Sequence, residues 1–116
     1  MTDTTNQPCR CLDPQCRFDA FDRIEIGVDE TNGRFGSVEL YRCKACERCW
    51  LRYHVEYESF SRSGRWFRGL ITTEQATSVT PENAAALLAS LPWHFYGGSY
   101  FDTPGKQGSG PVAVDL

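Results

Sequence analysis

The stretch YRCKACERCW, residues 41–50, decides the fold of this chain, because it places three cysteines at a strict spacing of three between two segments that alternate like β-strands. These cysteines are Cys43, Cys46 and Cys49. A disulfide between residues three apart closes a strained ring, so the three are not expected to pair with one another. The other cysteines of the chain form a second group near its amino end, Cys9, Cys11 and Cys16. The sequence therefore indicates that two groups of thiols meet.

The segment before this stretch has the period-two pattern of a half-buried strand and contains an Asn-Gly turn signal. A three-residue loop at 31–33 pairs Ile24 with Leu40 and Ile26 with Val38, so that apolar side chains share one face. A two-residue turn would mix the core and solvent faces. The first hairpin is therefore predicted with the three-residue loop.

The segment after the cysteines alternates in the same way. A loop at 62–64 pairs Val55 with Ile71 and Phe60 with Trp66. This register places the Arg-rich tip of the second hairpin at an exposed end of the sheet, far from the cysteines.

We predict an α+β fold in one domain, residues 1–116, with an antiparallel β-meander of about four strands, one helix and a structural metal site. The helix is predicted to have Thr80 as its N-cap and Pro81 at its first position, and to end before Pro92. The predicted parts in order are a flexible tail at 1–8, a cysteine loop at 9–20, the meander at 21–75, the helix at 80–91 and an aromatic, Gly-rich tail at 92–116.

The spacing of Cys43 and Cys46 at a turn between strands allows both sulfurs to reach one ion at about 2.3 Å. This knuckle resembles half of a zinc ribbon, and the resemblance extends over roughly the first half of the chain. It implies a structural zinc bound by four thiolates, with no open position for water. Glycine usually follows the second cysteine of such a knuckle, whereas Glu47 stands there in this chain.

The expected ligands take two cysteines from each group: Cys11, Cys16, Cys43 and Cys46. Pro14 suits a tight turn between the first two of them, whereas cysteines only two apart point in opposite directions in an extended strip. The alternates are Cys9 and Cys49. Two other interpretations stay open, an iron–sulfur cluster bound through the C-x-x-C-x-x-C run and a thiol redox pair.

Composition narrows the class of protein. The chain has 15 acidic and 12 basic residues among 116, and no apolar run approaches the ~20 residues of a membrane span. Its polar first residues lack the features of a signal peptide, so we expect a small cytoplasmic, bacterial protein that does not insert into membranes. With two histidines and no nucleophile motif, no enzyme activity is predicted.

Basic and aromatic residues alternate around the second hairpin. The candidate binding residues are Arg52, Arg62, Arg65, Trp66 and Arg68. Arginine and tryptophan are enriched at protein hot spots, so we expect a protein–protein binding module, an adaptor or an inhibitor such as the immunity partner of a toxin. The alternative is a zinc-ribbon-like binder of RNA or single-stranded DNA, in which the aromatic rings stack on bases.

Overall fold

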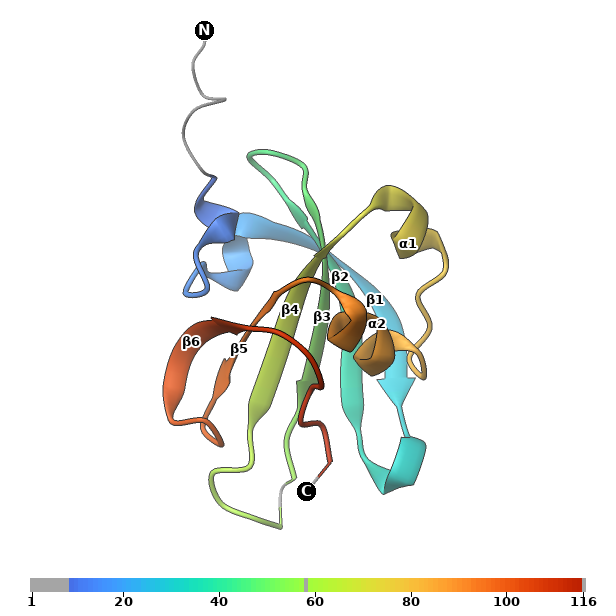
Figure 1. Ribbon diagram of the computed structural model, residues 1–116, viewed down its shortest axis with the longest axis vertical. Coiled ribbons are helices and arrows are strands. Elements are labelled where there is room, and N and C mark those ends of the chain that lie inside the picture. The colour runs from blue at the N-terminus through green and yellow to red at the C-terminus, as the bar shows by residue number, and fades with distance from the viewer. Residues whose placement is uncertain (1–8, 58, 116) are drawn as a thin grey trace, which may run out of the picture.

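The computed structural model describes residues 9–57 and 59–115, so the flexible tail expected at 1–8 lies outside the described chain. Its centre is a six-stranded antiparallel sheet in which each strand pairs with the next one along the chain (Figure 1). The strands are β1 (Phe21–Asp29), β2 (Gly36–Cys43), β3 (Cys49–Val55), β4 (Arg65–Ile71), β5 (His94–Gly98) and β6 (Thr103–Gly108). The predicted α+β class with an antiparallel meander is confirmed. The last two strands come from the segment predicted as an aromatic, Gly-rich tail.

The first hairpin has the predicted register over part of its length. Ile24 lies opposite Leu40, but a bulge at Ile26 then places Gly27 opposite Val38. The predicted pairing of Ile26 with Val38 is therefore wrong by one residue. A bulge inserts one unpaired residue into a strand, which an alternation pattern does not reveal.

The second hairpin has a different register from the predicted one. Val55 lies opposite Arg65 rather than Ile71, and the connecting loop runs from 56 to 64. The side chain of Ser63 closes this loop, because its hydroxyl accepts a hydrogen bond from the Tyr57 N–H at 2.8 Å and donates one to the Tyr57 carbonyl at 2.7 Å. The alternation of residues 51–57 thus extends past the end of β3 into a loop.

Two short helices follow the first four strands, α1 (Thr73–Thr77) and α2 (Ala84–Ser90). The sequence predicted one helix with Thr80 as its N-cap, whereas α2 begins after Asn83, whose side chain forms no capping bond with the helix. Thr80 and Asn83 instead exchange two hydrogen bonds, one from the Thr80 N–H to the Asn83 side chain at 2.8 Å and one from the Asn83 N–H to the Thr80 hydroxyl at 3.1 Å. These reciprocal bonds have the pattern of a capping box with Thr80 as the cap, and they close the turn at 81–83 that directly precedes α2.

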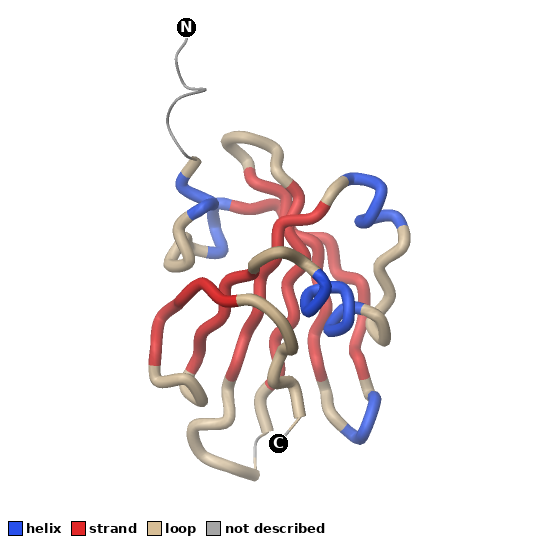
Figure 2. Tube along the Cα trace, viewed as in Figure 1, coloured by secondary structure: helices blue, strands red, loops and turns tan. Residues whose placement is uncertain are grey.

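The sheet is covered differently on its two faces. One face carries the larger core, in which Leu51, Tyr53 and Phe67 are buried together with Leu88 of α2. The second face carries Trp50 and other aromatic residues against the cysteine loop. Figure 2 shows α2 in front of the sheet, the cysteine loop near its upper end, and the loops of the first two hairpins at its lower end. Within the described residues, no helix has the length and apolar character needed to cross a bilayer.

Candidate metal centre

Four cysteine sulfurs converge where the cysteine loop meets the turn between β2 and β3. They belong to Cys9, Cys11, Cys43 and Cys46, and all lie within 4.8 Å of one another. The Sγ atoms of Cys9 and Cys43 are 3.5 Å apart, as are those of Cys11 and Cys46. Four thiolates bound tetrahedrally at about 2.3 Å from one ion are roughly 3.8 Å apart, so this group has the dimensions of a single metal site.

The group contains Cys9, one of the two alternates, where the expected set had Cys16. Residues Arg10–Leu12 form a 3₁₀ turn, closed by a hydrogen bond from the Leu12 N–H to the Cys9 carbonyl at 2.9 Å. The expectation rested on an extended strip, in which Cys9 and Cys11 diverge; the turn brings both to the same side. Cys16 lies outside the group, in the wall of a neighbouring cavity.

Cys49, the second alternate, also lies outside the group. It begins β3, where it is half-buried against the larger core, on the face of the sheet opposite that of Trp50. Alternation along the strand therefore separates it from Cys43 and Cys46, although all three are close in sequence.

The knuckle between β2 and β3 has the backbone of a metal-binding turn. The Cys43 N–H donates to the Arg48 carbonyl and the Glu47 N–H donates to the Cys43 carbonyl, each at 2.9 Å. Glu47 has φ of 65°, the left-handed conformation that favours glycine. The chain thus departs from the zinc-ribbon pattern in the side chain at this position and retains the expected backbone.

Hydrogen-bond donors surround the sulfurs. The Arg48 guanidinium donates from Nη1 to the Cys46 Sγ at 3.2 Å. Burial acts to raise the pKa of the Cys46 thiol, but the Arg48 backbone N–H and guanidinium outweigh it and lower that pKa to about 7. The knuckle therefore favours a thiolate at Cys46.

The indole N–H of Trp50 lies beside the Cys11 thiol, whose own environment, unlike that of Cys46, favours the protonated form. It is buried and has no hydrogen-bond partner within the described residues. Burial raises the pKa of the Cys11 thiol, and the Trp50 indole acts against this effect. A thiolate at Cys11 would supply the acceptor that this buried donor lacks.

Arg68 of β4 fastens the cysteine loop to the sheet. It is 3% exposed, and its guanidinium donates to the carbonyls of Cys11 at 2.7 Å and Asp13 at 2.9 Å. It also lies 4.3 Å from the ring centroid of Trp50. No carboxylate of the described chain forms an ion pair with it. Arg68 is therefore a buried positive charge beside the thiols, and not the exposed binding residue that the sequence suggested.

The other predicted binding residues do not form one exposed tip. Arg65 is 1% exposed, because the observed register makes it the first residue of β4, paired with Val55. Its guanidinium donates to the Ala113 carbonyl of the carboxy-terminal segment. Trp66 is half-buried opposite His54 and Gly97. Only Arg62 lies in an exposed loop.

Three of these residues instead meet beside the cysteine loop. Arg52, Trp66 and Arg68 line a cavity of about 240 Å³ together with Tyr41 and Cys16. The Arg52 guanidinium lies 5.5 Å from the Tyr41 ring centroid and donates from Nη1 to Glu39 at 3.5 Å. Cross-strand neighbours on one face of a sheet are several residues apart in sequence, so this grouping depends on the register.

The chain matches no family model, no curated protein and no solved structure.

Proposed function

We propose that the cysteine group binds one structural zinc ion. Four thiolates complete a tetrahedral site and leave no position for a water molecule or a substrate, which is the arrangement of structural rather than catalytic zinc. The observation that carries this proposal is the convergence of four sulfurs within 4.8 Å. A divalent ion with four thiolates has a formal charge of about −2. The cationic Arg48 and Arg68 and the unpartnered indole N–H of Trp50 fit such a charge.

Zinc is favoured over an iron–sulfur cluster because sulfurs this close together surround a single ion and leave no space for several irons with bridging sulfides. A tetrahedral four-thiolate site also suits a single iron, so the metal must be measured. Elemental analysis of the purified protein should find about one zinc per chain, and the solution should be colourless. Stoichiometric iron with visible absorption would assign the site to iron. A folded, metal-free protein with six reactive thiols would contradict a metal site.

We further propose that the protein acts by binding another protein, as an adaptor or an inhibitor of the toxin-immunity type, in a reducing compartment such as the cytoplasm. A closed metal site supports a role in folding rather than in catalysis. Large aromatic side chains on the exposed loops support a binding role. Affinity purification from the source organism tests this proposal, and a single stoichiometric partner is the expected result. The absence of any partner, with catalytic turnover detected, would contradict it.

A second candidate is binding of single-stranded nucleic acid. It is favoured by the cavity in which Arg52 and Arg68 accompany the rings of Tyr41 and Trp66, since arginines contact phosphates and aromatic rings stack on bases. A salt titration separates the two candidates. Affinity for an oligonucleotide should fall steeply with salt concentration if phosphate contacts dominate, and an oligonucleotide that does not bind at low salt removes this candidate.

A further inference from the structure

We propose that the end of the sheet farthest from the cysteines docks a protein partner that presents basic residues beside apolar ones. This inference rests on the proposed protein-binding function and identifies the surface and the chemistry of the partner. The surface, called the Phe35–Phe60 surface below, consists of Gly33, Phe35, Glu56, Tyr57, Ser59 and Phe60, which line a groove of about 370 Å³.

The two phenylalanines are among the most exposed apolar side chains of the described chain. Phe35, in the loop between β1 and β2, is 70% exposed, and Phe60, in the loop between β3 and β4, is 60% exposed. Tyr100, which is 51% exposed, lies near the same end, because its N–H donates to the Gly64 carbonyl at 2.8 Å. Exposed aromatic side chains gathered on neighbouring loops are typical of interaction sites.

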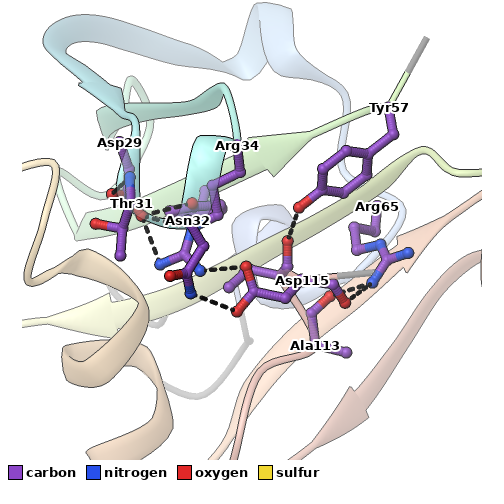
Figure 3. Close-up of polar contacts among 10 residues, drawn as sticks. Asp29, Thr31, Asn32, Arg34, Tyr57, Arg65, Ala113 and Asp115 are labelled. Carbon is purple, nitrogen blue, oxygen red and sulfur yellow. Dashed lines mark hydrogen bonds and ion pairs between the residues drawn. The ribbon is translucent and has the colours of Figure 1, made fainter. Parts of the chain in front are cut away.

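The loop that carries Phe35 is held by a buried network of charges (Figure 3). Asp29 is fully buried, and its carboxylate accepts hydrogen bonds from Arg34 Nε at 2.9 Å and from the Tyr53 hydroxyl at 2.7 Å. It also accepts the Thr31 N–H at 3.1 Å. These hydrogen bonds fix the loop before a partner binds, with Phe35 exposed to solvent. Binding therefore costs little conformational entropy in this loop.

The carboxy-terminal segment lies between Arg34 on one side and Tyr57 and Arg65 on the other, and bonds to both sides (Figure 3). The Tyr57 hydroxyl donates to the Val114 carbonyl at 2.6 Å, and Arg65 donates to the Ala113 carbonyl at 2.6 Å. Asp115 accepts Arg34 Nη1 at 2.6 Å. These contacts hold the two aromatic loops in fixed positions relative to each other, as a preformed binding surface requires.

The charges at this end select the partner. Its arginines are all engaged internally, Arg34 with Asp29 and Asp115, Arg62 with Asp102 at 3.0 Å, and Arg65 with carbonyl groups. Glu30 and Glu56 are exposed and form no ion pair among the described residues. The free charge beside the groove is therefore negative, and it complements a partner with lysine or arginine next to apolar side chains.

The test uses the full-length, metal-loaded protein as bait for a phage-displayed library of random linear peptides. Enriched peptides should combine basic with apolar residues, and their affinity should fall as the salt concentration rises. Replacing both Phe35 and Phe60 with alanine should weaken binding at least about tenfold, because both side chains are proposed hot spots. The matched control is Phe18→Ala, since Phe18 is 59% exposed but lies in the cysteine loop. It should leave the affinity unchanged.

If the melting temperature and the zinc content are unchanged in all variants, a loss of peptide affinity arises at the Phe35–Phe60 surface and not from a change in the fold. Glu56→Gln should weaken binding and reduce its salt dependence. Peptides that bind equally well to the Phe35→Ala, Phe60→Ala double variant would overturn this surface while leaving a protein-binding function in place. Enrichment of acidic peptides, or no enrichment at all, would overturn the inference. The affinity purification described above decides separately whether the protein has a protein partner.

Discussion

Glu47 occupies a backbone conformation that costs energy for a residue with a Cβ atom. Its φ of 65° lies where glycine is unstrained. Its side chain forms an exposed ion pair with Arg42 at 3.0 Å, which contributes little to stability. We predict that Glu47→Gly raises the free energy of unfolding of the metal-bound protein by roughly 0.5–1 kcal/mol. Thermal or urea unfolding measures this, with Glu47→Ala as the control that removes only the ion pair. A loss of stability on Glu47→Gly would show that strain at this residue is negligible.

Two cysteines of the same loop should respond differently to substitution. Cys9→Ser should lower the metal content well below one ion per chain, because the Cys9 sulfur belongs to the converging group. Cys16→Ser should leave the metal content unchanged. For the knuckle, Cys46→Ser and Cys49→Ser should differ in the same way. Elemental analysis of the four variants distinguishes the observed ligand set from the one expected from the sequence. Full metal binding by Cys9→Ser would show that Cys16, and not Cys9, is the fourth ligand.

The buried carboxylate of Asp29 predicts a particular response to acid. Burial acts to raise its pKa, but hydrogen bonds from Thr31 and Tyr53 and the pairing with Arg34 outweigh this and lower the pKa from 3.8 to about 2. Since the folded-state pKa is the lower one, the stabilisation is complete well above 3.8 and is lost as the pH falls toward 2. Its size is on the order of 2 kcal/mol.

The difference in unfolding free energy between the natural protein and Asp29→Asn should therefore shrink as the pH is lowered through this range. Urea unfolding at several pH values measures the difference, with exposed Asp22→Asn as the control. A difference that stays constant with pH would show that Asp29 does not contribute through its charge.

The metal site also shows what a sequence reveals at the scale of single residues. The C-x-x-C spacing at Cys43 and Cys46 predicted the knuckle, because a tight turn brings two such sulfurs together. The choice between Cys9 and Cys16 depends on a 3₁₀ turn without a sequence signature of its own. Cys9 and Cys11, on either side of Arg10, also indicated a pair of ligands. Their side chains would point in opposite directions only in an extended chain, and the turn removes that objection.

At the scale of elements, α2 depends on a glycine in β4. A Cβ atom at Gly69 would lie 2.7 Å from Leu88 Cδ2 and would also overlap Leu91. Gly69→Ala should therefore destabilise the protein by about 1–3 kcal/mol through overpacking. In combination with Leu91→Ala, which removes one of the overlapping groups, the loss should be smaller than the sum of the two single losses. Simple additivity in urea unfolding would show that α2 shifts freely on the sheet.

Elements defined by local patterns were predictable, and those defined by side-chain bonding were not. Alternating residues predicted the first four strands. The register of the second hairpin differs from the predicted one because the Ser63 side chain bonds to the backbone of Tyr57, so that β3 ends earlier than the alternation suggests. Side-chain to backbone bonds of this type compete with secondary structure and leave the apolar pattern unchanged.

For the whole molecule, metal removal should release the cysteine loop without unfolding the sheet. The larger core lies on the opposite face and contains none of the four converging cysteines. Treatment with a strong chelator should therefore increase hydrogen exchange at residues 9–20 and alter the fluorescence of Trp50, while the strands stay protected. Re-addition of zinc should reverse both changes. Cooperative loss of protection throughout the sheet would show that the metal stabilises the entire fold.

The meander has a consequence for the speed of folding. All neighbouring strands are consecutive in the chain, and most are joined by short loops, although residues 72–93 with both helices separate β4 from β5. The cysteine loop makes contacts over longer sequence distances, because Cys9 meets a partner 34 residues away and Arg68 reaches across 57 residues to Cys11. The carboxy-terminal segment does so as well, since Asp115 pairs with Arg34 across 81 residues. Refolding should therefore separate into a rapid phase that is insensitive to zinc concentration and a slower phase, the docking of the cysteine loop, whose rate increases with zinc.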